Sequence, residues 1–223
     1  MELPHKRTPE AGWLHQAWIR SLKWWPAKMI GMTLGIALFF AAYFWVLHHP
    51  FFPVTIMPLT AVDRLIGFRP EVLPLYLSLW LYVSLAPALM IERREIMSYA
   101  IAAVGMSLIG LGIFLVWPTT VVWSDADQSR HPAFAFLKTV DASGNACPSL
   151  HVAFAVFTAA CLGRLLPQMG AGRVVCAFNW LWCLGILYST VAIRQHVALD
   201  VLAGAGLGGV IAVVYLHRLR VSS

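Results

Sequence analysis

The chain has 223 residues, of which 60% are hydrophobic and 12% are charged, and its mean hydropathy is +0.73. Soluble domains carry about twice this share of charged residues, and several apolar runs exceed the ~18 residues that a membrane-spanning helix needs. The composition therefore excludes an ordinary soluble domain and predicts an all-α integral membrane protein. The formal net charge of +6 does not indicate nucleic-acid binding, because the basic residues follow the membrane topology.

Residues 1–28 are rich in basic and aromatic side chains. Within them, residues 12–25 fit a helix that lies flat at the membrane surface, with its tryptophans at headgroup depth. A basic tail that only sets the orientation of the protein fits them equally well. The apolar run that follows is too long for the core of a signal peptide, so we predict an uncleaved first span. Residues 29–223 are predicted to form one membrane domain.

Hydropathy and breaker residues divide this domain into six predicted spans. They cover residues 29–47, 72–91, 96–117, 149–167, 174–193 and 197–216. An even number of spans puts both termini on one side, and most of the 16 lysines and arginines fall on that side. The positive-inside rule therefore places both termini in the cytoplasm and the two long loops outside. We predict a multi-pass protein of a cell membrane, such as a bacterial inner membrane, with its outer loops in the periplasm.

Small residues in the later spans are predicted to serve packing. Three of the four cysteines, Cys161, Cys176 and Cys183, lie in predicted spans, and only Cys147 falls in a loop, so no disulfide framework is indicated. A tight turn of charged residues is predicted at 92–95. The last span carries a series of glycines, which we interpret as a surface for close helix packing. These glycines are Gly204, Gly206, Gly208 and Gly209.

A histidine and an aspartate stand at the start of the last span. Asp200 is the only acidic residue inside a predicted span, and an ionised group at the bilayer centre costs roughly 2.5–3.5 kcal/mol or more, which predicts a functional role. On a helix, His196 and Asp200 are four residues apart and share one face. A carboxylate in that position can fix the tautomer of an imidazole and stabilise its cationic form.

A second cluster precedes the fourth predicted span. Pro148 and Ser149 stand immediately before a long apolar run, which is a typical helix start. Free backbone N–H groups and the helix dipole make such a start an anion site. The predicted topology brings His151 to the same membrane face as His196. Two imidazoles, a carboxylate, a hydroxyl and a helix N-terminus suit phosphoryl transfer, in which one imidazole attacks phosphorus and the other protonates the leaving oxygen.

These motifs, Pro148-Ser-Leu-His151 and Ser189-x6-His196-x3-Asp200, resemble the second and third motifs of the type-2 phosphatidic acid phosphatase superfamily. The resemblance implies a six-helix membrane enzyme that acts on lipid phosphates or diphosphates without a metal or other cofactor. By this resemblance, His196 is the nucleophile that forms a phosphohistidine, Asp200 orients it, and His151 is the general acid and base. Ser149 and the amides that follow it bind phosphate.

The motifs also depart from the family pattern. Leu150 stands where the second motif has glycine, Thr190 stands where the third motif has arginine, and the first motif, a lysine followed seven residues later by Arg-Pro, is not found. These variants resemble the branch that contains inositol phosphorylceramide synthase. Members of that branch pass a phospho-headgroup to an acceptor alcohol, so water and an alcohol both stay open as acceptors.

A bound phosphate still needs cations and hydrogen-bond donors. Arg194, two residues before His196, is the preferred cation. The resemblance adds Ser189 and Thr190 by their motif positions. Arg130 and Lys138 in the long loop complete the predicted substrate-binding set. Arg64 and Arg69 are further options.

Two other classes of function fit parts of the pattern. Cys147, His151, His196 and Asp200 offer donors for zinc, although the helix-start signature favours an anion site. Ionisable residues inside spans also mark transport paths, and a non-catalytic transporter or scaffold with a vestigial site is the second alternative. The clustering at one interface favours the enzyme. The predicted partners are a lipid phosphate or diphosphate, the bilayer and an acceptor alcohol, with no metal and no nucleic acid.

Overall fold

A computed structural model describes residues 12–122 and 144–221 of the chain. The described part is almost entirely helical, with two two-residue strands. The elements in chain order are α1 (Trp13–Leu22), α2 (Trp25–His48), β1 (Thr55–Ile56), α3 (Ala61–Leu65), the 3₁₀ turn η1 (Pro70–Val72), α4 (Leu73–Leu77), α5 (Leu79–Leu89), α6 (Arg93–Val116), β2 (Thr119–Thr120), α8 (Leu150–Gln168), α9 (Arg173–Ala192) and α10 (Ala198–Val221).

Six stretches of helix within the described residues are long and apolar enough to cross a membrane. They correspond to the six predicted spans, so the prediction of an all-α membrane bundle is confirmed. The first span begins earlier than predicted, at Trp25, because Pro26 stands in the first turn of α2, where its missing N–H costs nothing. Lys28 therefore lies inside the first span.

The second span is bent. It runs from Pro70 to Leu89 through η1, α4 and α5, and it breaks at Ser78 between α4 and α5. The Ser78 hydroxyl donates to the carbonyl of Leu75 at 2.6 Å and accepts from the indole N–H of Trp182 on α9 at 3.1 Å. A serine that bonds back to its own helix often bends it, and the bond to α9 fixes the bend in the bundle.

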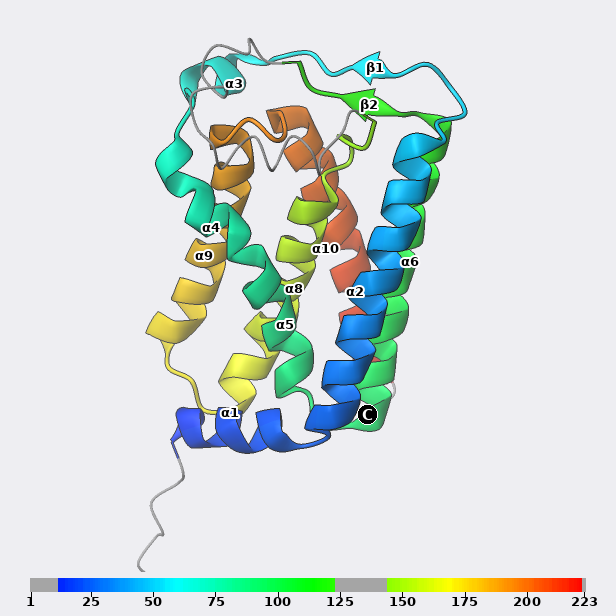
Figure 1. Ribbon diagram of the computed structural model, residues 1–223. Helices are drawn as coiled ribbons and strands as arrows, with labels where there is room; N and C mark the ends of the chain where they lie inside the picture. The colour runs from blue at the N-terminus through cyan, green and yellow to red at the C-terminus, as the bar shows by residue number, and fades with distance from the viewer. Residues whose placement is uncertain (1–11, 123–143, 222–223) are drawn as a thin grey trace, which may run out of the picture.

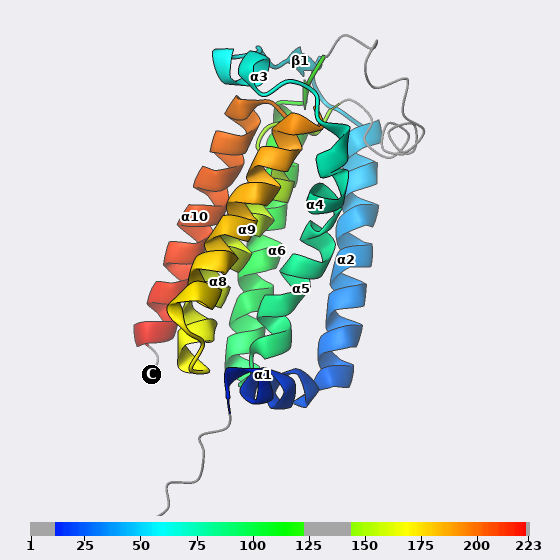
Figure 2. The ribbon, with the colours of Figure 1, turned by 90° about the vertical axis from the view of Figure 1, so that its left-hand side faces the viewer.

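Helix α8 is the central element of the bundle. It packs against α10, α9 and α5 (Figures 1 and 2), and more of it is buried than of any other spanning helix in the described ranges. Its sequence between Leu150 and Gln168 is largely apolar, which is typical of a helix that neighbours enclose. The catalytic candidates Ser149 and His151 stand at one end of this central helix.

Two glycines bring α10 into backbone contact with α8. A Cβ added at Gly204 would lie 2.3 Å from the carbonyl oxygen of Ser149, and one added at Gly208 would lie 2.3 Å from that of Ala153. A Cβ at Gly206 or Gly209 would meet nothing within 4 Å. The packing interpretation of this glycine series therefore applies to Gly204 and Gly208, which are one helical turn apart.

The bundle has two distinct ends. At one end, α1 lies across the helices, and α10 ends on the same side (Figures 1 and 2). At the opposite end, α3 and the parallel pair of β1 and β2 cover the bundle. The candidate site lies at this second end, which we call the site end. Its outward orientation in the membrane stays a prediction.

The predicted charged turn at 92–95 is wrong for all of its residues except Glu92. Helix α6 already begins at Arg93, so Glu95 lies in its first turn, where it is buried and forms an ion pair with Arg164 of α8. An acidic residue in the first turn is favoured by the helix dipole. The pair joins α6 to α8 at the end opposite the site.

Candidate active site

A tight turn after α9 places His196. The carbonyl of Thr190 accepts the backbone N–H groups of Gln195 at 3.1 Å and of His196 at 3.2 Å. Arg194 has a left-handed backbone conformation with φ of 62°, which reverses the chain within this turn. The turn lets α10 start almost directly after α9 ends, and it leaves His196 just before the first residue of α10.

Asp200 is fully buried beside this turn. Its Oδ2 accepts the backbone N–H of Val197 at 3.1 Å. Asp200 is the third residue of α10 and Val197 is the residue before the helix, so this bond caps the start of α10. The same oxygen lies 3.5 Å from Nδ1 of His196, an ion-pair distance rather than a hydrogen bond. A carboxylate near Nδ1 favours a proton on that nitrogen, so Nε2 is the nitrogen left for a substrate.

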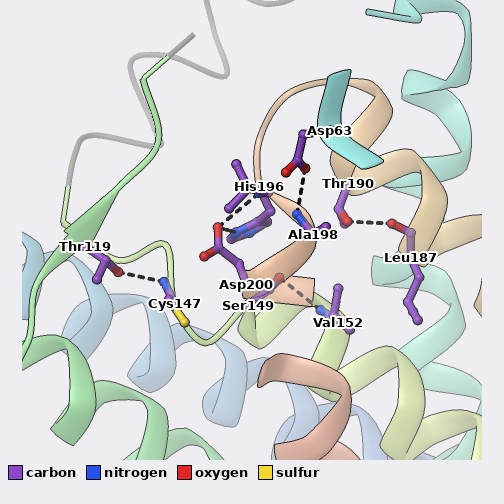
Figure 3. A network of polar contacts seen from close by, with 11 residues as sticks. Asp63, Thr119, Cys147, Ser149, Val152, Leu187, Thr190, His196, Ala198 and Asp200 are labelled. Carbon is purple, nitrogen blue, oxygen red and sulfur yellow. Dashed lines mark hydrogen bonds and ion pairs between the residues drawn. The ribbon is translucent and has the colours of Figure 1, made fainter. Parts of the chain in front are cut away.

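Asp63 adds a second carboxylate to the start of α10 (Figure 3). Its Oδ1 accepts the N–H of Ala198 at 2.7 Å, while its Oδ2 accepts both the N–H and the hydroxyl of Thr60 at 2.7 Å. Asp63 is 3% exposed although it belongs to the first long loop. The loop helix α3 is thereby attached to the residues that follow His196.

Replacing Asp63 with alanine is expected to loosen this attachment. The substitution leaves the half-buried N–H of Ala198 without its acceptor, and an unsatisfied group that is fully buried costs about 1–3 kcal/mol, which sets the upper limit of the loss. Thermal unfolding of the purified protein in detergent measures the loss. Glu71→Ala is the matched control, because Glu71 is an exposed carboxylate near the same end of the loop. Equal midpoints for the two variants would contradict the assigned role.

The start of α8 is joined to the start of α10. Ser149 caps α8, since its hydroxyl oxygen accepts the N–H of Val152 at 3.3 Å. Its own N–H donates to the backbone carbonyl of Asp200 at 3.1 Å. The positive end of the α8 dipole therefore lies next to the turn that carries His196. Helix starts commonly bind anions, so the prediction of an anion site between the two helices stays a prediction.

His151 is held by Tyr76 of α4. Its Nε2 lies 3.2 Å from the carbonyl oxygen of Tyr76, and the two rings stack with centroids 4.0 Å apart and an interplanar angle of 3°. A carbonyl can only accept, so the proton of the neutral ring is on Nε2 and Nδ1 is the acceptor nitrogen. The bend of the second span thus supplies the group that orients this imidazole.

Both imidazoles line one cavity of about 630 Å³. Asn145 and the aromatic rings of Tyr43 and Tyr76 line the same end of it, and the Asn145 side chain donates to the carbonyl of Tyr43 at 3.4 Å. The remaining lining is largely apolar and comes from α2, α5, α6 and α8. Ligand pockets of ~300–1,000 Å³ with a few convergent polar groups are typical binding sites.

The described residues of the predicted substrate-binding set, Ser149, Ser189, Thr190 and Arg194, do not line this cavity. Ser189 and Thr190 are fully buried, and their hydroxyls donate to the carbonyls of Ile186 and Leu187 within α9, both at 2.7 Å. The guanidinium of Arg194 lies 5.4 Å from the ring centre of Phe68. The structure therefore brings together Ser149, His151, His196 and Asp200 at the starts of α8 and α10. Ser189 and Thr190 belong to the end of α9, and Arg194 belongs to the turn that follows it.

The remaining predicted cations lie in the two long loops. Arg130 and Lys138 lie outside the described residues. Arg64 is exposed and donates to the carbonyl of Leu59 at 3.4 Å, and Arg69 is exposed beside Glu71 at 3.9 Å. The prediction that one of these cations binds phosphate stays a prediction.

Cys147 has a structural environment. Its N–H donates to the hydroxyl of Thr119 at 2.7 Å, which ties the segment before α8 to β2. Burial raises the pKa of the Cys147 thiol to about 11, and the negative charge of Asp200 adds to the increase. A neutral thiol is a poor metal ligand. Within the described ranges, no group of three or more His, Cys, Asp and Glu side chains is arranged to hold a metal ion.

Leu150, which stands where the second motif has glycine, packs against α6. A Cβ added at Gly110 of α6 would lie 2.4 Å from Cδ2 of Leu150, so the leucine occupies the space that a side chain at 110 would fill. Leu150 also lines the cavity beside His151. The change in the motif is thus accommodated by a glycine on a neighbouring helix.

The sequence that forms this site also matches a known family. A family model described as the PAP2 superfamily matches residues 96–222, which is more than half of the chain. The chain belongs to the PAP2 superfamily. The matched region of this PAP2 protein contains both imidazoles, Ser149 and Asp200, whereas α1 to α5 precede it. Comparisons with curated proteins and with solved structures gave no match.

Membership in the PAP2 superfamily confirms the resemblance to the type-2 phosphatidic acid phosphatases. Members are generally phosphatases and phosphotransferases, and this PAP2 protein is a multi-pass membrane protein. Three residues of the PAP2 site escaped sequence reasoning. Asp63 could have been found, because Thr60-x-x-Asp63 is a capping-box pattern. Tyr76 and Asn145 carry no local signal, since only the bend of the second span and the strand pairing bring them to the site.

Proposed function

We propose that this PAP2 superfamily protein is a lipid phosphatase or phosphotransferase that acts on a lipid phosphate or diphosphate through a phosphohistidine on His196, without a metal, at the extracytoplasmic face. The single observation that carries the proposal is that His151 and His196, from separate helices, line one cavity next to the capped start of α8. The buried carboxylate of Asp200 lies beside the imidazole of His196. The two imidazoles therefore have different surroundings, as a nucleophile and a general acid require.

The reaction has two steps. In the first, Nε2 of His196 attacks phosphorus, the bond between phosphorus and the lipid oxygen breaks, and the protonated imidazole of His151 gives a proton to that oxygen. Asp200 balances the positive charge that develops on His196. In the second step, His151 takes a proton from water or from an alcohol, that oxygen attacks phosphorus, and the phosphorus–nitrogen bond breaks. Free phosphate or a new phosphate ester leaves, and both residues return to their starting states.

The phosphate oxygens need compensation for their negative charge. The start of α8 supplies partial positive charge, and Ser149 is the proposed hydroxyl donor. Because Ser149 is fully buried and caps α8, the proposal includes a local movement that brings its hydroxyl to the phosphate. Arg194, Arg130 and Lys138 are the proposed cations. Direct phosphate binding by Arg194 requires its side chain to leave the face of Phe68, and the proposal for Arg194 therefore includes this movement.

A panel of lipid phosphates and diphosphates, with and without candidate acceptor alcohols, tests the function. Release of free phosphate indicates a phosphatase, and formation of a new ester without free phosphate indicates a headgroup phosphotransferase like inositol phosphorylceramide synthase. The absence of turnover over the whole panel would favour the non-catalytic scaffold or transporter. Turnover that a chelator abolishes would contradict the metal-independent mechanism.

The general-acid role of His151 is expected to depend on the leaving group. His151→Gln is expected to reduce kcat on an alkyl phosphate by about 10²–10⁴-fold, the usual contribution of a general acid. With p-nitrophenyl phosphate the loss is expected to be much smaller, because that leaving group departs without a proton. Steady-state kinetics on both substrates measure the difference, with His48→Gln as the control at an exposed histidine of the site end. Equal losses on both substrates would assign His151 a different role.

A further inference from the structure

The cavity that contains the two imidazoles extends far beyond them. Its lining on α2 runs from Tyr43, near the site end, to Lys28, near the opposite end. At about 1.5 Å per helical residue, this separation is roughly 22 Å. One leaflet of the hydrocarbon core is about 15 Å deep, half of the ~30 Å total. The cavity is therefore longer than one leaflet.

The walls of the cavity are apolar and partly built from small residues. Gly31 and Gly35 on α2 face it, and Ala100 and Ala103 on α6 line it as well. A Cβ added at Gly31 or at Gly35 would meet nothing within 4 Å. These two positions therefore border open space rather than a packed neighbour, and together they leave room for a slender apolar ligand.

Lys28 closes the end of the cavity away from the site. Its side chain is buried, and its ammonium donates to the carbonyls of Arg20 at 2.8 Å and Ala88 at 2.7 Å. Arg20 belongs to the crosswise helix α1, and Ala88 belongs to the last turn of α5. The floor is thus polar and fixed by two hydrogen bonds, and an apolar chain gains nothing by extending into it.

From these features we infer that the cavity binds one hydrocarbon chain of the substrate lipid, and that the space at Gly31 and Gly35 sets the longest chain it accepts. The inference rests on the proposed function, because the hydrocarbon chain is identified by its attachment to the phosphate at the two imidazoles. A phosphate held between His151 and His196 carries a chain, and the apolar space that both imidazoles line is the cavity itself. Gly35 lies ~12 Å and Gly31 lies ~18 Å along α2 from Tyr43, so the two positions divide the cavity by depth.

Filling the cavity at these positions tests the inference. Gly35→Leu is expected to reduce kcat/KM for hexadecyl phosphate by at least about tenfold, since a few methylenes in an apolar pocket are worth that much or more. The value for hexyl phosphate is expected to stay within about twofold of wild type. Gly31→Leu, which fills the deeper position, is expected to reduce the hexadecyl value while sparing decyl phosphate. The dissociation constants of the same three alkyl phosphates are measured in parallel with inactive His196→Ala protein that carries each leucine.

Ala37→Leu is the matched control, because Ala37 is an exposed residue of the same helix that does not line the cavity. Equal effects of Gly35→Leu on the long and short chains, or the same chain-length effect from Ala37→Leu, would overturn the inference and leave the proposed function intact. If wild type neither releases phosphate from any chain nor forms a new ester with any acceptor alcohol, the proposed function fails. In that case, length-dependent binding that the leucines abolish still supports the chain site, and binding that is independent of chain length refutes it.

Discussion

Replacement of His196 with alanine is expected to reduce kcat by at least about 10⁴-fold, because the substitution removes the proposed nucleophile and no neighbouring group can take its place in the first step. Asp200 is fully buried at the start of α10 and does not line the cavity, so its carboxylate is not placed to attack a phosphorus atom there. The measurement is phosphate release or ester formation on the best substrate from the lipid panel.

The covalent intermediate gives a second readout that a loss of folding would not imitate. Wild type incubated with labelled substrate and quenched in alkaline detergent is expected to carry base-stable phosphate that acid then removes, and His196→Ala is expected to carry none. His49→Ala is the control, because His49 is an exposed histidine of the site end that bonds only to its own helix and stacks on Trp45 within the described residues. Labelling that persists in His196→Ala would show that a different residue is the nucleophile.

Gly204→Ala is expected to have the second large effect. Its methyl group would lie 2.3 Å from the carbonyl oxygen of Ser149, so one of the two helix backbones must move. Overpacking of this kind costs about 1–3 kcal/mol or more. The displaced carbonyl belongs to the residue that caps α8, and a 1 Å error in placement can cost about 10²-fold in rate. We therefore expect a lower unfolding temperature together with a loss of turnover.

Gly206→Ala is the matched control on the same helix. A methyl group there would meet nothing within 4 Å, and alanine is favoured over glycine in a helix by about 1 kcal/mol in solution. The Gly206 variant is expected to equal or exceed wild type in thermal stability and to retain full activity. If both alanines have the same effect, the close contact between α8 and α10 is not what holds the site together.

The spanning helices could be predicted from sequence because each buries apolar residues over a length set by the bilayer. The prediction was wrong where a short polar stretch had to be divided between turn and helix. Glu95 was assigned to a turn, although its partner Arg164 lies almost seventy residues later and allows it to sit inside α6. Such a pair has no local pattern, so only the packing of α6 on α8 shows it.

The centre of the candidate site could also be predicted, because the four residues Ser149, His151, His196 and Asp200 lie in two short motifs. Their meeting depends on the even number of spans between the two motifs, namely the fourth and fifth, which hydropathy indicates. The supports of the site could not be predicted in the same way. Tyr76 reaches His151 only because the second span bends at Ser78, and Asp63 reaches Ala198 only because the first loop folds over the bundle.

The contact between Leu150 and Gly110 has a consequence for related sequences. The leucine fits because position 110 has no side chain, so the two positions share a single volume. We expect them to covary among homologues. A relative with glycine at the position of Leu150 is free to carry alanine, valine or leucine at the position of Gly110, whereas bulky residues at both positions should be rare. In a family alignment, the identity of residue 110 can then separate two groups of sequences that have leucine in this motif. In one group the leucine is inherited, and in the other it arose recently.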